Sequence, residues 1–149
     1  MPYIFPQGHI LDDLFKTVQD FVEFIVIRNA QEEGIQNIQQ SMGRVLFNKE
    51  MNTLRLGLPR RSGNSTLALM IFQHYPSSIL ILNNSSQIRE FQRNPLLRSC
   101  DSSRRIFSKS GRITGISPSV VIVDMSSYLT DQEQENIFSI NSNAFILLG

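Results

Sequence analysis

Apolar residues recur every three or four positions near the start of the chain, a spacing that predicts an amphipathic helix. The residues that share its apolar face are Leu11, Phe15, Val18, Val22 and Ile25. Asp12 and Asp13 lie near its start, where the helix dipole favours acidic side chains, and Gly34 is expected to end it. The apolar face is expected to pack on a sheet or on a partner subunit.

A second helical stretch is predicted directly after the first. Ile35, Ile38 and Met42 keep the same spacing until Gly43 closes the pattern. Residues 1–43 are therefore expected to form an N-terminal helical segment.

Short apolar runs and helix-like segments alternate over the rest of the chain. The strands are expected at residues 45–47, 53–56, 78–82, 105–108, 119–124 and 144–148. The helices are expected from Ser65 to just before Pro76, over 87–93 after a cap in 83–86, and over 130–140 with Thr130 as cap. Apolar runs without polar alternation are typical of parallel strands buried on both faces. The pattern predicts a three-layer α/β sandwich with a mostly parallel sheet, preceded by the N-terminal helical segment.

The length and composition favour one soluble domain. A chain of 149 residues is the size of a single domain, here spanning 1–149. No apolar run reaches the roughly 20 residues that span a bilayer, and the first residues lack the features of a secretory signal. Cys100 is the only cysteine, so no internal disulfide can form. We therefore expect a cytoplasmic protein that does not bind a membrane.

The charge is distributed unevenly along the chain. The net charge is −3 over residues 1–50, +8 over 51–112 and −4 over 113–149. The basic part includes a segment with weak secondary-structure signals, residues 94–117, which is expected to be a basic loop. Such a block attracts polyanions such as nucleotide phosphates or a nucleic-acid backbone, and it is equally typical of a solvated loop.

Seven basic side chains in this block are candidates for contacts with nucleic-acid phosphates. They are Arg89, Arg93, Arg98, Arg104, Arg105, Lys109 and Arg112. Only Phe91 and Phe107 lie among them as aromatic residues, so non-specific backbone binding fits better than base stacking. The same arginines could instead serve the nucleotide of a neighbouring subunit.

The segment 54–69, LRLGLPRRSGNSTLAL, combines a short apolar run, a turn with Gly and Ser, and a helix-like run. In a phosphate-binding loop, backbone N–H groups of such a turn and of the following helix converge on nucleotide phosphates. Residues 63–66, Gly-Asn-Ser-Thr, occupy the places of G-K-S/T-T. The full signature is not met, because Leu58 replaces the first glycine and Asn64 the lysine. The segment therefore resembles a P-loop with changed key residues.

A second motif follows about sixty residues after Ser65. The run Val120–Asp124, VVIVD, resembles the Walker B motif, in which the acid at the strand end holds a magnesium ion, usually through water. The alternative for Asp124 is a strand-end residue that caps a turn toward Ser126 or Ser127.

Together the two motifs look most like the ATPase domains of viral DNA-packaging terminases and helicases, over roughly residues 54–93 and 119–149. This resemblance implies a P-loop NTPase-like fold that binds ATP, or another nucleoside triphosphate, with Mg²⁺. It also implies a host cytoplasmic location if the protein is viral.

The same resemblance implies roles for individual residues. Gly63 would allow close approach of the backbone to phosphate, and Thr66 would contact the α-phosphate side. Ser65 and Asp124 would hold the metal, so Asp124 is the candidate catalytic residue. The charge missing at Asn64 would come from Arg60 or Arg61, which precede Ser62 in the loop.

Two departures from the family pattern argue against rapid hydrolysis. Asn64 removes a cation that stabilises the transition state of phosphoryl transfer. Met125 follows Asp124 where the family places a glutamate that orients water, and only Glu133 or Glu135 could substitute. We therefore predict nucleotide binding with weak or absent hydrolysis, in a protein that handles nucleic acid.

Two rival interpretations remain open at the level of sequence. The first is a non-enzymatic, viral-type scaffold that binds nucleic acid or protein through its basic segment or N-terminal helix. The second is a competent ATPase. In each case the apolar face over residues 11–27 and the edge strands are compatible with a homo-oligomer.

Overall fold

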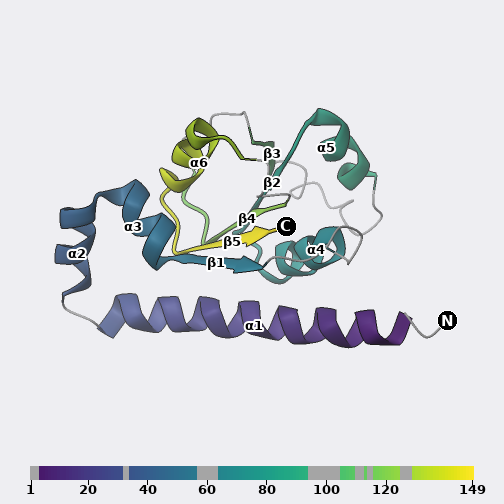
Figure 1. Ribbon diagram of the computed structural model, residues 1–149, viewed down its shortest axis with the longest axis horizontal. Helices are drawn as coiled ribbons and strands as arrows, with labels where there is room; N and C mark the ends of the chain where they lie inside the picture. The colour runs from purple at the N-terminus through teal and green to yellow at the C-terminus, as the bar shows by residue number, and fades with distance from the viewer. Residues whose placement is uncertain are drawn as a thin grey trace.

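The computed structural model of the chain describes residues 4–31, 34–56, 64–93, 105–109, 113, 116–124 and 129–149. The helices within these ranges are α1 (Ile4–Gln31), α2 (Ile35–Met42), α3 (Arg44–Met51), α4 (Asn64–His74), α5 (Ser85–Gln92) and α6 (Asp131–Phe138). The strands are β1 (Thr53–Leu56), β2 (Ile79–Leu82), β3 (Ile106–Ser108), β4 (Val120–Val123) and β5 (Ala144–Leu148). The protein thus has an α/β fold that begins with the long N-terminal helix (Figure 1).

The five strands form one sheet, in the order β1-β5-β4-β2-β3, and every pair of neighbours is parallel. One row of paired residues crosses the whole sheet and faces the same side, namely Leu54, Ile146, Ile122, Leu80 and Ile106. Strands β2, β4 and β5 are buried along their whole length. The continuous apolar runs in the sequence therefore reflect a sheet covered on both faces.

Helices pack on both faces of this sheet and give two apolar cores. On one face, Val18 and Val22 of α1 and Leu67 and Phe72 of α4 pack together, and Phe91 of α5 joins the same cluster. The core on the other face contains Ile137 and Phe138 of α6, with Val45 of α3 packed against it. Figure 1 shows α1 running along one side of the sheet next to α4, with α6 on the other side.

The predicted elements are confirmed at most positions. The start of the first helix differs, because α1 begins at Ile4 and Asp12 and Asp13 lie beyond its first turn. Residues 45–47 are a second difference. The sequence predicts a strand there, whereas these residues belong to helix α3. The buried positions of this helix and of the residue that caps it are Phe47, Asn48 and Asn52, and Val45 is partly buried. Because two of these three buried positions are asparagines, the helical period is hidden from a search for apolar residues.

The buried asparagines belong to a polar network at the amino ends of the strands. Asn48 Nδ2 donates to the carbonyl oxygens of Phe138 (2.8 Å) and Ile140 (3.2 Å), and its Oδ1 accepts from Asn52 Nδ2 (2.9 Å). Arg28 of α1 donates to Asn52 Oδ1 and to the carbonyl oxygen of Met51, the latter at 2.7 Å. These bonds tie α1, α3 and the segment before β5 together, since buried polar groups need hydrogen-bond partners.

Substitution of Asn48 by Ala is expected to lower the free energy of unfolding by at least about 3 kcal/mol. The change leaves two buried carbonyl groups and the Asn52 amide without their partner, and each unsatisfied group costs about 1–3 kcal/mol. Urea denaturation with a fitted slope and midpoint measures this effect. The matched control is Asn143→Ala at an exposed position, for which a change within about 0.5 kcal/mol is expected. Equal values for both variants would contradict the role of the network.

Candidate functional site

The candidate site lies at the carboxyl edge of the sheet, where the connections after β2 and β4 diverge. Strand β2 continues through α5 to β3 on one side, and β4 continues through α6 to β5 on the other. Phe91 of α5 and Phe138 of α6 lie in the cores of opposite faces. In an open parallel sheet, such a switch point leaves a crevice at the carboxyl ends of the strands, where ligands bind.

Asp124 is the acidic residue at this switch point. It follows β4 directly and is only 3% exposed. Its backbone N–H donates to the carbonyl oxygen of Ile81 (3.0 Å), and its carboxylate Oδ2 accepts from Gln87 Nε2 (3.4 Å). The ends of β4 and β2 and the start of α5 thus hold the carboxylate in one place.

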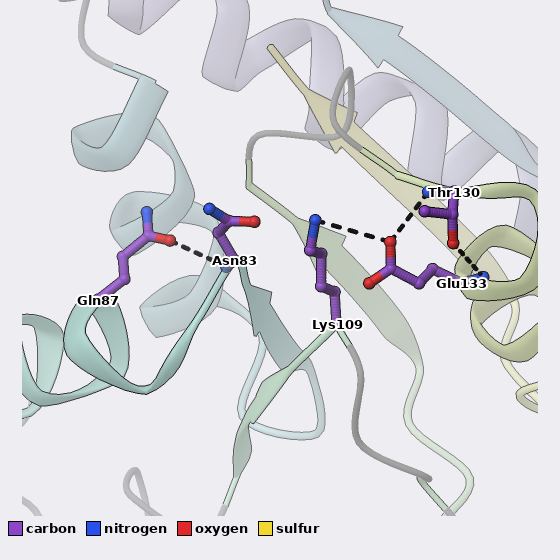
Figure 2. A network of polar contacts seen from close by, with 5 residues as sticks. All are labelled: Asn83, Gln87, Lys109, Thr130 and Glu133. Carbon is purple, nitrogen blue, oxygen red and sulfur yellow. Dashed lines mark hydrogen bonds and ion pairs between the residues drawn. The ribbon is translucent and has the colours of Figure 1, made fainter.

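Gln87 links Asp124 to the end of strand β2. Its Oε1 accepts from the backbone N–H of Asn83 at 2.9 Å, as Figure 2 shows. The position of Gln87 is set by the start of α5, where Asn84 caps the helix by accepting from the Gln87 N–H (2.9 Å). The sequence indicated this cap, but it contained no signal that the side chain of Gln87 reaches Asp124.

An ion pair lies at the same edge of the sheet. Lys109, the residue after β3, places its Nζ 3.6 Å from Glu133 Oε1 on α6. Glu133 also accepts from the Thr130 N–H (2.9 Å), and the Thr130 hydroxyl accepts from the Glu133 N–H (3.2 Å), which completes a capping box (Figure 2). The pair joins the two sides of the switch point.

The hydrogen bond from the Thr130 backbone lowers the pKa of the Glu133 carboxyl below its ordinary value of 4.5, and the Lys109 ammonium adds to this effect. Glu133 is therefore a carboxylate at neutral pH, already engaged by Thr130 and Lys109. Glu135, the other candidate substitute for the missing glutamate, is exposed on α6.

The predicted phosphate-binding loop is described only at its carboxyl end. Arg60, Arg61, Ser62 and Gly63 lie outside the described residues, as do the side chains of Asn64 and Ser65. The backbone of Asn64 begins α4, and Thr66 is exposed in its first turn. The predicted helix start near Ser65 is therefore confirmed.

Strand β1, which leads into that loop, ends at the same edge of the sheet as β4. One strand, β5, separates them, so their axes lie about 10 Å apart. The fold thus brings the end of β1 and Asp124 to one edge of the sheet. Met125, Ser126 and Ser127 lie outside the described residues, and so does the predicted turn that Asp124 would cap.

The structure separates the predicted phosphate-contacting residues into groups. Arg98, Arg104 and Arg112 lie outside the described residues, and of the predicted basic loop 94–117 only residues 105–109, 113 and 116–117 are described. The predicted strand near 106 is confirmed as β3. Arg89 and Arg93 are exposed on α5.

Arg105 and Lys109 have contacts inside the fold. The Arg105 guanidinium lies 4.3 Å from the centre of the Phe72 ring and donates to the carbonyl oxygens of Ser78 (2.9 Å) and Tyr75 (3.4 Å). Because it precedes β3, it lies at the amino edge, away from Asp124. Lys109 lies at the carboxyl edge but pairs with Glu133.

Comparison of the chain with protein-family models, curated proteins and solved structures found no match. Within the described residues, no helix combines the length and hydropathy required to cross a membrane.

Substitution of Glu133 by Gln is expected to remove a pH-dependent part of the stability. Because the folded-state pKa is lowered, the carboxylate stabilises the protein above about pH 4.5 and this contribution is lost as the pH falls through the folded-state pKa. The glutamine can keep the capping box, so the difference at pH 7 should stay below about 1 kcal/mol.

Urea denaturation of both proteins between neutral pH and pH 3 measures this difference. Glu135→Gln removes one carboxylate from the same helix and provides the baseline. A stability difference between wild type and Glu133→Gln that widens on acidification would contradict the assignment.

Proposed function

We propose that the chain binds a nucleoside triphosphate with Mg²⁺ at the carboxyl edge of the sheet, and that it hydrolyses the nucleotide slowly or not at all. The observation that carries the proposal is the position of Asp124, a buried carboxylate at the end of β4. It shares this edge with the end of β1, from which residues 57–63 lead into the N-terminus of α4.

The chemistry of these groups suits a magnesium nucleotide. Mg²⁺ prefers oxygen ligands and keeps several of its waters, so it is held by one or two carboxylates together with phosphate oxygens. The ends of β1 and β4 flank the end of β5 at this edge of the sheet. Asp124 and Ser65 would hold the ion, which would supply charge neutralisation to the β- and γ-phosphates.

The phosphates would be bound by backbone and side-chain donors of the loop. Gly63 and the first N–H groups of α4 would supply backbone donors, which at a helix N-terminus favour an anion. Thr66 is exposed in the first turn of this helix. Arg60 or Arg61 would supply the cation that a P-loop lysine normally provides.

Slow turnover follows from the residue at position 64. Catalysis of phosphoryl transfer is mostly electrostatic, so asparagine in place of lysine removes much of the stabilisation of the transition state. Glu133 is engaged by Lys109 and Thr130, which leaves it poorly suited to act as a base for water.

A protein-binding role is the second candidate, and exposed apolar side chains on α1 favour it. Phe24 is 59% exposed and Ile27 is 45% exposed, one turn apart on the helix, while Val18 and Ile25 are fully buried. Exposed apolar residues grouped on a helix are typical of an interface. In this alternative, α1 binds another protein or a second copy of the chain.

Calorimetric titration with ATP and GTP, with and without Mg²⁺, tests the nucleotide proposal. Wild type is expected to bind with micromolar affinity in the presence of Mg²⁺. Asn64→Lys should bind about tenfold more tightly, because it restores a cation at the phosphates, and Asp124→Asn should bind about tenfold more weakly with Mg²⁺. Circular dichroism checks that the Asp124 variant folds.

The control for the loss of one carboxylate is Asp20→Asn, which changes an exposed residue of α1. If neither wild type nor Asn64→Lys shows a measurable heat of nucleotide binding, the nucleotide proposal is overturned. Equal affinities for wild type and for Asp124→Asn in folded form would also overturn it.

Substitution of both Phe24 and Ile27 by Ser is expected to shift a self-associating protein to the monomer, since it removes the exposed apolar stripe. Sedimentation velocity over a range of concentrations measures the change. Val26→Ser is the matched control, because residue 26 is also exposed but points about 200° away from residue 24 around the helix. A wild type that stays monomeric at all concentrations would exclude self-association through α1.

A further inference from the structure

A polar cleft lies along α5 and the two residues that precede it. It has a volume of about 650 Å³ and is open to solvent. The described residues that line it are Asn83, Asn84, Ser86, Gln87, Arg89, Glu90 and Arg93. Every one of these described side chains is polar or charged, which favours a polar ligand on this side of the cleft.

Two arginines give the cleft a positive charge. Arg89 and Arg93 are exposed and four residues apart, so they stand on the same side of α5, about 6 Å from each other along its axis. Across the described residues, neither arginine forms an ion pair with a carboxylate. Arg89 Nε donates to the Ser85 carbonyl oxygen (3.4 Å) within α5, and the exposed remainder of its guanidinium group and that of Arg93 can contact an external anion.

Other residues that line the cleft supply hydrogen-bond donors for phosphate oxygens. Asn83, Asn84 and Ser86 add amide and hydroxyl groups that can donate to phosphate oxygens. Guanidinium groups bind phosphates in a bidentate manner, and two of them at this spacing can contact successive phosphates of a chain. Glu90 lies on the same stripe and reduces the positive potential without cancelling it.

We propose that this cleft binds the phosphodiester backbone of a single-stranded nucleic acid without regard to sequence. A flexible single strand can bend into a hollow of this size, whereas a duplex holds its phosphates on a rigid cylinder. Phe91, the aromatic residue of α5, is buried in the core and cannot stack on a base. Recognition therefore rests on phosphates, which carry no sequence information.

The binding cleft adjoins the proposed nucleotide site but does not depend on it. Gln87 lines the cleft and also donates to Asp124 (3.4 Å), so the two sites meet at the carboxyl edge of the sheet. The two proposals use different residues for binding, and each can fail without the other.

Fluorescence anisotropy of labelled oligo-dT, titrated over a salt series, tests the proposal. The variant Arg89→Gln with Arg93→Gln is expected to bind about tenfold more weakly at low salt. Loss of two phosphate contacts should also reduce the slope of log affinity against log salt by about 1.4. The matched control, Lys16→Gln with Arg44→Gln, removes two exposed charges elsewhere and should keep the wild-type slope.

A variant that is expected to strengthen the binding of oligo-dT provides a further check. Glu90→Gln removes the carboxylate from the cleft and should tighten binding of oligo-dT about two- to threefold. Failure of wild type to bind oligo-dT, equal losses in the two double variants, or tighter binding of a duplex of the same sequence would each overturn the proposal.

Calorimetry with Mg²⁺ and ATP on the same variants separates the two sites. The arginine variant should keep the nucleotide affinity of wild type, and Asp124→Asn should keep the affinity for oligo-dT. Loss of both ligands in either variant, with the fold intact by circular dichroism, would contradict two separate binding surfaces.

Discussion

The rest of the structure depends on a sheet whose five strands all run in the same direction. Neighbouring parallel strands need crossover connections, and helices that make these connections cover both faces. The central strands are then buried along their whole length, which explains why their sequences are continuous apolar runs. Because every strand points the same way, all carboxyl ends meet at one edge and all amino ends at the other.

The two edges of the sheet use polar residues differently. At the amino edge, Arg28, Asn48 and Asn52 bond to one another and to backbone carbonyl groups, which binds helices to the sheet. At the carboxyl edge, Asp124 and Gln87 lie where the connections diverge, beside a cleft that opens to solvent. The first group stabilises the fold, and the second group fixes the carboxylate at the end of β4.

The basic residues of the middle segment likewise include some that stabilise the fold and some that face solvent. Arg105 stacks on Phe72 and donates to two carbonyl groups, so its charge belongs to the packing of β3. Arg89 and Arg93, which are close to it in sequence, face solvent from α5. Net charge along the sequence therefore marks a basic region correctly, but it cannot distinguish a charge that fixes the fold from one that meets a partner.

The sequence by itself determined the alternation of helices and buried strands, a cap within residues 83–86, the cap at Thr130, and the acid that ends β4, because each depends on residues close together in the chain. It misassigned α3, whose buried Asn48 donates to the carbonyl oxygens of Phe138 and Ile140, about ninety residues away. Only the tertiary structure decided the strand order, the hydrogen bond between Gln87 and Asp124, and the ion pair between Lys109 and Glu133. Those contacts depend on which strands become neighbours, and local periodicity carries no information about that choice.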